Sequence, residues 1–189
     1  MDMVTESLIA RCIRKEPKAQ YELYRSLYGT MLSICTRYER NRQDAAARMN
    51  QAFLKVLQNI GERKADVPFM PWVRRIVINT VIDDYRKNKE RNAMEELGPP
   101  PPSSASVEVN EYLAEMEAEA FATLLMNVPP MSRNVFNLHA IDGLPHAEIA
   151  GLLGISEGTS KWHVAHARSI LQRAIVRMAG RSVPQTASR

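Results

Sequence analysis

Four consecutive prolines near the middle of the chain limit its folding more than any other feature. They lie in the stretch GPPPPSSAS at residues 98–106 of a 189-residue chain, and proline neither donates a backbone hydrogen bond nor continues a helix. Such a segment is typical of an extended, polyproline-leaning linker. The sequence therefore predicts two small domains, residues 1–95 and 109–180, joined by a flexible linker at 96–108 and followed by a tail at 181–189.

Apolar residues in both halves recur at the three- and four-residue spacing of amphipathic helices. One such stripe begins at Leu8, a second runs from Leu23 to Cys35, and a third runs from Met49 to Ile60. No segment shows the alternation of a strand. The predicted fold class is therefore all-α, with two small helical domains. Further helices are expected at Trp72–Arg91, Val107–Asn127 and Ser132–Ile141.

Composition and the N-terminal sequence narrow the class of protein. A hydrophobic content of 45% argues against wholesale disorder, and a net charge of +4 permits a polyanionic partner without demanding one. The N-terminal MDMVTESLIA has no basic region, so it does not resemble a signal peptide. No apolar run approaches the roughly 20 residues that span a bilayer. We expect a soluble cytoplasmic protein in which Cys12 and Cys35 are buried free thiols.

The signatures of enzymes and metal sites are missing from the sequence. It has no glycine-rich phosphate loop, no nucleophile elbow, and neither Cys-x-x-Cys nor His-Glu-x-x-His spacing. His163 and His166 lie three residues apart on an expected helix, but no third ligand accompanies them. We therefore expect no enzymatic activity, no cofactor and no metal.

The stretch Leu144–Ile175 has the pattern of a helix-turn-helix. Gly154 tolerates the positive φ of a tight turn, and Ser156 can cap the helix that follows. That second helix is rich in hydrogen-bond donors, as in helices that enter a DNA major groove. Similar three-helix units occur in proteins that never bind DNA, but the excess of donors favours nucleic acid. Trp162 must either pack on the first helix or contact thymine methyl groups.

The helix expected before the linker combines basic residues with aromatic ones. Cations follow phosphates while rings stack on exposed bases, so this mixture suits unpaired nucleic acid. The same mixture also occurs on salt-bridged helix surfaces, and it gains weight only beside a duplex-binding module. The aromatic residues are Trp72 and Tyr85, and the basic residues are Arg74, Arg75, Arg86, Lys87, Lys89 and Arg91.

Together these features resemble the extracytoplasmic-function sigma factors, the smallest members of the main bacterial sigma family. The run from Trp72 to Arg86 is similar to the family pattern W-x-x-R-I-x-x-N-x-x-x-D-x-x-R, and the run from Val128 to Thr159 follows the family's promoter-recognition module. The resemblance implies a protein that binds RNA polymerase core and directs it to promoters. Its C-terminal domain would recognise the minus-thirty-five element as duplex, and its N-terminal domain the minus-ten element while the strands separate.

The resemblance also implies three sets of site residues. Within the minus-ten set, residues 77–80 would hold a flipped-out non-template base. The minus-ten set is Trp72, Arg74, Arg75, Val77, Ile78, Asn79, Thr80, Asp83, Arg86 and Lys87. The minus-thirty-five set is Thr159, Ser160 and His163, with Lys161, Trp162, Ala165 and His166 toward the bases and Arg133 and Arg168 nearer the phosphates. The polymerase-binding set is Asp44, Asn50, Gln51, Phe53 and Leu54.

The chain departs from the family pattern at two places. The family's acidic, polymerase-docking run is replaced here by alanines at 46, 47 and 52, with Arg48 beside them. Lost complementary charge should slow docking or require compensation elsewhere. Ser160 stands where the family usually buries a valine. By family analogy, a membrane-linked anti-sigma factor that clamps the two domains is a further partner.

Two other functions stay open from the sequence. The first is a stand-alone helix-turn-helix regulator that binds duplex DNA unaided, although the N-terminal half lacks the alternating strands of a receiver domain. The second is a sigma-derived interaction module whose docking to polymerase has weakened, which the thinned acidic run would explain.

Overall fold

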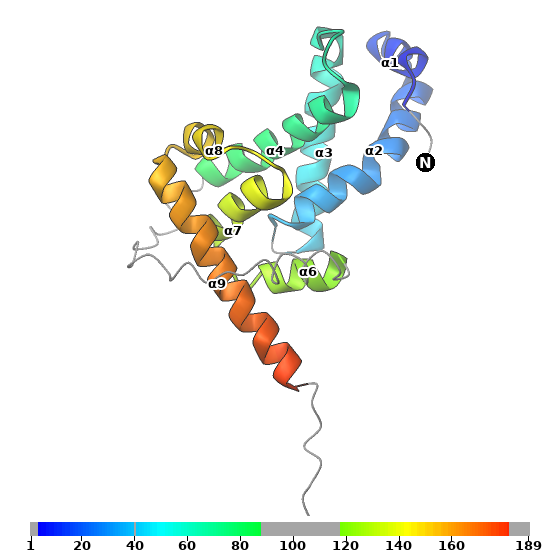
Figure 1. Cartoon of the computed structure of the whole chain (residues 1–189). Coiled ribbons are helices and arrows are strands. Elements are labelled where there is room, and N and C mark those ends of the chain that lie inside the picture. The colour runs from blue at the N-terminus through cyan, green and yellow to red at the C-terminus, as the bar shows by residue number, and fades with distance from the viewer. Residues whose placement is uncertain (1–3, 40, 88–117, 182–189) are drawn as a thin grey trace, which may run out of the picture. The chain divides into compact units, whose positions relative to one another are not determined.

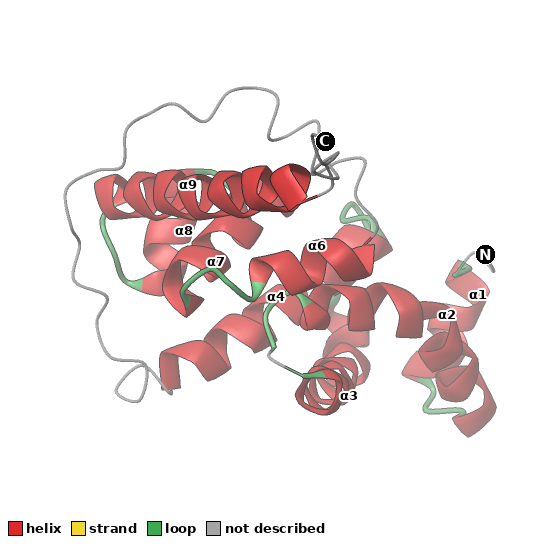
Figure 2. Ribbon diagram, turned by 90° about the horizontal axis from the view of Figure 1, so that it is seen from below, coloured by secondary structure: helices red, strands yellow, loops and turns green. Residues whose placement is uncertain are grey.

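A computed structural model of the chain describes residues 4–39, 41–87 and 118–181. All regular elements in these ranges are helices, which confirms the predicted all-α class (Figures 1 and 2). The chain divides into two compact units, Met1–Arg91 and Asn92–Arg189. The predicted linker at 96–108 lies outside the described residues, as does the chain beyond Arg181. None of the described helices is long and apolar enough to cross a membrane.

The N-terminal unit is built from helices that follow the predicted apolar stripes. Thr5 caps the first helix by accepting a hydrogen bond from the Leu8 N–H (3.2 Å). Asn41 caps the third by accepting one from the Asp44 N–H (2.8 Å). The elements are α1 (Glu6–Ile13), α2 (Pro17–Thr36), α3 (Arg42–Asn59), the short 3-10 helix η1 (Ile60–Glu62) and α4 (Phe69–Lys87).

The interior of this unit is apolar. Side chains from α2, α3 and α4 meet there, and Thr80 is the one buried polar residue among those described in this unit. Its hydroxyl donates to the Ile76 carbonyl of its own helix (2.7 Å), so it is satisfied locally. The two thiols, Cys12 and Cys35, are buried and free as predicted, and burial raises the pKa of Cys35 to about 12. Fully buried core residues include Leu23, Leu27, Met31, Met49, Val56 and Val73.

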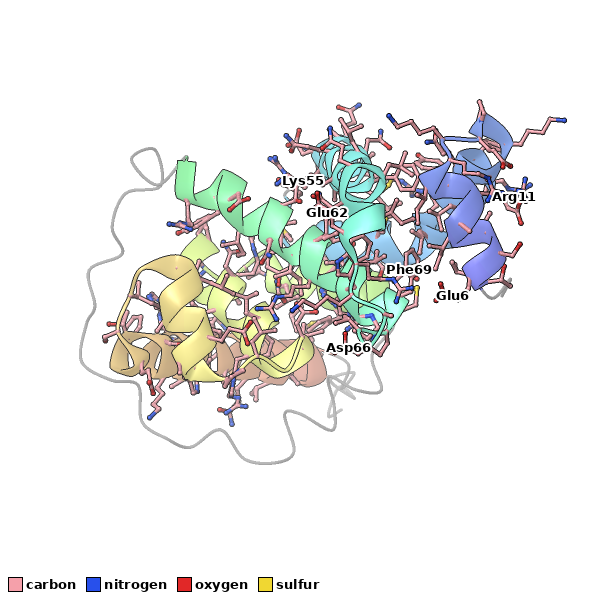
Figure 3. The ribbon with its side chains drawn as sticks, turned by 90° about the horizontal axis from the view of Figure 1, so that it is seen from above. Glu6, Arg11, Lys55, Glu62, Asp66 and Phe69 are labelled. Atoms are coloured by element: carbon pink, nitrogen blue, oxygen red, sulfur yellow. The ribbon has the colours of Figure 1, made fainter. Side chains whose placement is uncertain are left out.

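Polar contacts in the N-terminal unit lie at its rim. Arg63 donates from Nη2 to Glu6 Oε1 (2.8 Å) and from Nη1 to the Val67 carbonyl (2.6 Å). Its guanidinium carbon also lies 5.8 Å from the centroid of the Phe69 ring, a cation–π contact. Glu6 and Phe69 are labelled in Figure 3. Arg63 therefore ties α1 to the connection between η1 and α4.

The C-terminal unit is a helical group built on one long helix. Helices α6, α7 and α8 all contact α9, the rod that ends the described chain in Figure 1. The predicted helix at Ser132–Ile141 is confirmed, but its second half, Asn137–Ile141, winds as a π-helix. The elements are α6 (Ala118–Leu125), α7 (Pro130–Phe136), η2 (Asn137–Ile141), α8 (His146–Leu153) and α9 (Glu157–Arg181).

The predicted helix-turn-helix is confirmed as α8, a tight turn and α9. Gly154 ends α8 in the left-handed conformation, with φ of 65°. Ser156 Oγ then accepts a hydrogen bond from the Thr159 N–H (2.9 Å), as expected of an N-cap. These two residues set the angle at which α9 leaves the turn.

Candidate nucleic-acid interfaces

The N-terminal half of α9 sorts its residues onto an outer and an inner side. Successive side chains turn by about 100° along a helix, so residues 161, 162, 165 and 166 share one side. Lys161 is exposed, and Trp162, Ala165 and His166 are partly exposed. The inner side carries Val164, Ala167 and Leu171, which are buried. The four residues predicted to face bases therefore lie together on the outer side, next to the partly exposed Arg168.

Two residues predicted as DNA contacts lie on the inner side instead. Ser160 is 0% exposed and His163 is 3% exposed. The Ser160 hydroxyl lies 2.9 Å from His146 Nδ1, and His163 Nδ1 lies 2.9 Å from the Ser132 hydroxyl. Helix geometry turns these two side chains toward α8 and α7, so neither is exposed on the side of α9 that carries Lys161. The serine in place of the family's valine is explained by this bond to His146.

Arg133 is a third predicted DNA contact that is buried. It is 4% exposed, and its Nη1 donates to Met126 Sδ (3.2 Å). A guanidinium held in this way does not lie on the outer side with Lys161, so its predicted phosphate contact is not supported. Thr159 is partly exposed at the start of α9, where its hydroxyl lies 2.9 Å from Ser156 Oγ.

All four histidines of the sequence lie in the C-terminal unit, and they form two pairs. The rings of His139 and His146 stack with centroids 4.0 Å apart. The Nδ1 atoms of His163 and His166 both approach the Ser132 hydroxyl, at 2.9 and 3.1 Å. The described residues contain no group of three His, Cys, Asp or Glu side chains that could hold a metal. Sequence reasoning treated His163 and His166 as groove-facing donors and missed both pairings.

Burial sets the protonation of two of these rings. It lowers the pKa of His163 to about 4, with the nearby His166 as a smaller cause, and it also lowers the pKa of His146. Trp162 covers the His163–His166 pair, with its ring centroid 4.6 Å from that of His166 and 5.1 Å from that of His163. Near neutral pH, His163 is therefore an uncharged member of the interior.

One stripe of α4 carries most of the polar residues predicted to bind the minus-ten element. Trp72, Arg75, Asn79, Asp83 and Arg86 follow each other at three- or four-residue steps, which places them on one side of the helix. All of them are exposed or partly exposed. This stripe can offer an aromatic ring, two guanidinium groups and an amide to a single strand.

Lys55 adds a cation to this stripe from a different helix. Its Nζ lies 3.3 Å from Asp83 Oδ2, which brings α3 beside the exposed side of α4 (Lys55 is labelled in Figure 3). The α4 pattern contains no signal for Lys55, because the contact joins residues 28 positions apart. Sequence reasoning therefore missed it.

The four consecutive residues predicted to form a base pocket do not share a face. Val77 is 0% exposed, Thr80 is 2% exposed and Ile78 is 4% exposed, while Asn79 is partly exposed. Consecutive helical residues point about 100° apart, so a run of four encircles the helix. Val77 and Thr80 belong to the side of α4 that carries Val73 and Val81, and only Asn79 of the four lies on the polar stripe.

Two other members of the predicted set also fall outside the stripe. Arg74 is exposed but lies well around the helix from Asn79. The side chain of Lys87 lies outside the described residues.

The residues predicted to bind polymerase lie on α3, and most of them already have partners. Asp44 accepts a hydrogen bond from Asn41 Nδ2 (2.7 Å) as part of the helix cap. Asn50 Oδ1 accepts from the Tyr24 hydroxyl (3.1 Å), and Gln51 Oε1 accepts from Arg48 Nη1 (2.8 Å). The charge of Arg48 is balanced by Glu39, whose Oε1 lies 3.0 Å from Arg48 Nε.

Aromatic rings extend this face onto α2. The Phe53 ring meets Tyr24 edge-on, with centroids 5.1 Å apart, and Tyr24 lies 5.7 Å from Tyr28. Leu54 is 54% exposed and Tyr28 is 38% exposed. We call Tyr24, Tyr28, Phe53 and Leu54 the aromatic patch.

Comparison with known proteins matches both halves of the chain. Residues 23–91 match the family "Sigma-70 region 2", and residues 118–178 match "Sigma-70, region 4". The ECF RNA polymerase sigma factor SigM of Mycobacterium tuberculosis (strain H37Rv) is 26% identical over 170 residues, which cover 89% of this chain and 83% of SigM. The RNA polymerase sigma-H factor of Pseudomonas aeruginosa is 23% identical over 188 residues, 90% of this chain and 93% of that protein.

A solved structure, CnrH in complex with the cytosolic domain of CnrY, aligns with a TM-score of 0.49 and 20% identity, over 90% of this chain and 96% of that one.

A region 2 domain followed by a region 4 domain defines a factor that brings RNA polymerase to promoters. The chain belongs to the extracytoplasmic-function group of the sigma-70 family. It is an RNA polymerase sigma factor that binds core polymerase and promoter DNA in promoter-specific initiation. The alternative of a stand-alone regulator is the weaker explanation, because region 2 occupies the N-terminal half.

Proposed function

We propose that the outer side of α9 recognises the minus-thirty-five element through Lys161, Trp162, Ala165 and His166. The observation that carries this proposal is the sorting of α9, in which these four side chains are exposed or partly exposed while Ser160 and His163 are buried. Lysine and histidine offer hydrogen bonds to base edges, and the small Ala165 allows close approach to a thymine methyl group. Arg168 lies beside them, within reach of phosphates.

The stripe on α4 binds the minus-ten element as its strands separate. Arg75, Arg86 and Lys55 supply the positive charge that holds a phosphate backbone. Asn79 offers an amide to the edge of an unstacked base, and Trp72 offers a ring for stacking. Asp83 holds Lys55 at the border of the stripe through their 3.3 Å ion pair.

The aromatic patch, together with the amides of Asn50 and Gln51, docks on core polymerase. Because no carboxylate replaces the missing acids at residues 46, 47 and 52, apolar burial must supply the affinity that charge supplies elsewhere. Exposed Leu54 and Tyr28 give the patch apolar area to bury. We place the protein in the cytoplasm and assign it no catalysis of its own. An anti-sigma partner rests on the family resemblance alone.

A paired substitution on α9 tests promoter recognition. Lys161→Ala with His166→Ala should weaken binding to the preferred upstream element by about 1–3 kcal/mol for each lost base contact. Arg173→Ala is the matched control, since Arg173 is exposed on the same helix and its Nε donates to the Ser169 carbonyl of that helix. Equal loss on all DNA sequences would show that the pair contacts only phosphate.

A titration against core polymerase tests docking. Phe53→Ala with Leu54→Ala should weaken binding at least tenfold, whereas Ile13→Ala, which removes an apolar side chain that is 48% exposed on α1, should not. Affinity of the unaltered chain should change little with salt, because screening acts on charge and not on apolar burial. Absence of any binding would favour the sigma-derived interaction module.

A further inference from the structure

Two imidazole rings share a single hydroxyl behind the outer side of α9. Ser132, on α7, is 0% exposed, and its Oγ lies 2.9 Å from His163 Nδ1 and 3.1 Å from His166 Nδ1. A serine hydroxyl has one proton and can donate it to only one of the two nitrogens. At least one ring must therefore carry a proton on Nδ1 and donate it to Ser132.

The surroundings of the two rings differ. His163 is 3% exposed, whereas His166 is partly exposed and lies between the Ser132 hydroxyl and the Trp162 ring. If His166 donates to Ser132 and Ser132 donates to His163, the same bonds serve His166 whether it is neutral or charged. In the reverse order, His163 donates to Ser132 and Ser132 donates to His166. A proton added to His166 Nδ1 would then face the Ser132 oxygen that already accepts from His163, and the Ser132 hydroxyl would lose its acceptor. The first order is therefore favoured.

This order determines what His166 presents to the outside. With its proton on Nδ1, a neutral imidazole has an unprotonated Nε2, which accepts hydrogen bonds. Once the ring is protonated, Nε2 becomes a donor. In the major groove adenine and cytosine offer amino donors, whereas guanine offers the acceptors N7 and O6. Charged or titratable side chains on the elements that pack here include Arg133 on α7, His146 and Glu148 on α8, and Glu157, Lys161, His163, Arg168, Arg173 and Arg177 on α9.

We propose that Ser132 is a positioning residue that fixes the proton of His166 on Nδ1 and thereby makes His166 select a base with an amino donor. The selected base at that position is adenine or cytosine when His166 is neutral, and guanine when it is protonated. This inference rests on the proposed function, in which α9 recognises duplex DNA. It adds a specificity determinant and a dependence on pH that involve a residue outside the recognition helix.

The test is a selection with the complete chain bound to core polymerase. The probe is a library of duplex promoter fragments randomised across the upstream element, selected at about pH 8 and at about pH 6. At one position the unaltered protein should prefer adenine or cytosine roughly fivefold or more at the higher pH, and shift toward guanine at the lower pH.

Four variants distinguish positioning from simple folding. Ser132→Ala should reduce both the preference and its shift with pH, while Ser132→Thr, which keeps the hydroxyl, should restore them. His166→Gln, which does not titrate, should bind without the pH shift, and this surface change keeps the test valid even if Ser132→Ala fails to fold. Ser26→Ala is the control, because the Ser26 hydroxyl donates to the Glu22 carbonyl within α2.

Three outcomes would overturn the inference. A guanine preference at the higher pH would mean that His166 presents a donor, and an unchanged pH shift in Ser132→Ala would remove Ser132 from the mechanism. A base preference in His166→Gln that still shifts with pH as it does in the unaltered protein would remove His166. If the upstream element shows no enrichment at all, the assignment of α9 fails as well, whereas normal enrichment without a pH shift overturns only this inference.

Discussion

The two units differ in what their interiors contain. In the N-terminal unit the described core is apolar apart from Thr80, and its ion pairs lie at the rim. The C-terminal unit buries polar side chains on α9 and on the helices that support it. These are Ser132, Arg133, Asn134, Asn137, Ser160 and His163.

This difference teaches how each unit positions its functional helix. Apolar packing is tolerant of small rotations, whereas hydrogen bonds are directional and costly to break in a dry interior. Ser132 on α7 and His146 on α8 each bond to α9, so the roll of the recognition helix is held from two sides. Removing one partner of such a bond costs more than the bond itself contributes. The C-terminal unit therefore holds α9 in a defined orientation, but its stability is more sensitive to substitution and to acid.

The largest expected effect comes from the apolar core. Leu27→Ala, at a site that is 0% exposed, should lower the free energy of unfolding of the N-terminal unit by about 2–5 kcal/mol, through lost burial and the cavity left behind. Denaturant unfolding followed by Trp72 fluorescence, in a chain carrying Trp162→Phe, measures it. Leu54→Ala, at an exposed site, should cost under about 0.5 kcal/mol. Equal costs would mean that α2 is not packed as described.

Lowering the pH should destabilise the C-terminal unit more than the N-terminal unit. The folded-state pKa of His163, about 4, lies below the ordinary value of 6.5, so the unfolded chain takes up a proton first as pH falls. Stability of the C-terminal unit should therefore fall as pH drops through 6.5 and level off below about 4, with a loss of about 2 kcal/mol between about pH 7 and about pH 5. His146, whose pKa is also lowered by burial, changes stability in the same direction.

Trp162 fluorescence in a Trp72→Phe chain measures this loss during denaturant unfolding. His163→Leu should remove most of the acid sensitivity. The N-terminal unit has no histidine, so its own transition should not move over this range through histidine titration. An equal loss of stability in both units on acidification would contradict the contrast between the apolar and the polar interior.

Local patterns were sufficient to predict the helices and the turn between α8 and α9. Apolar spacing locates α1 to α4, and Gly154 and Ser156 mark the turn because their roles depend only on neighbouring residues. The partners of buried polar groups were not predictable in this way. Ser132 and His163 are 31 positions apart, and nothing in either segment specifies the other.

The candidate DNA site shows the same limit. The outer side of α9 follows from helix geometry, and four of the predicted residues lie on it. The predicted base pocket treated a motif that is contiguous in sequence as contiguous in space, whereas Val77 is buried and Asn79 is partly exposed on another side of α4. Lys55 was missed because it reaches Asp83 from another helix.

A smaller effect should come from the bond between Ser160 and His146. Ser160→Val introduces the residue that the family usually has, but it leaves His146 Nδ1 without its partner and should cost about 1–3 kcal/mol. Combining it with His146→Leu removes both polar groups and should be nearly neutral. Thermal unfolding of the two variants measures the difference. If the single change is already neutral, the polar interior does not hold α9 as argued.

The smallest effect concerns the joint between α1 and α2, at the rim of the apolar unit. Lys15 has φ of 60°, a left-handed conformation that costs a residue with a Cβ about 1 kcal/mol. Lys15→Gly should relieve this strain and stabilise the N-terminal unit by less than about 1 kcal/mol, because glycine also loses more entropy on folding. Lys15→Ala, which keeps the Cβ, should give no such gain when both are compared by denaturant unfolding. The gain from Lys15→Gly should not depend on pH, because it arises from the backbone. The effect of His163→Leu on stability should depend on pH, because that change removes a titrating ring. A gain that changed between about pH 7 and about pH 5 would mean that titration also tunes the apolar unit, and the contrast between the two interiors would not hold.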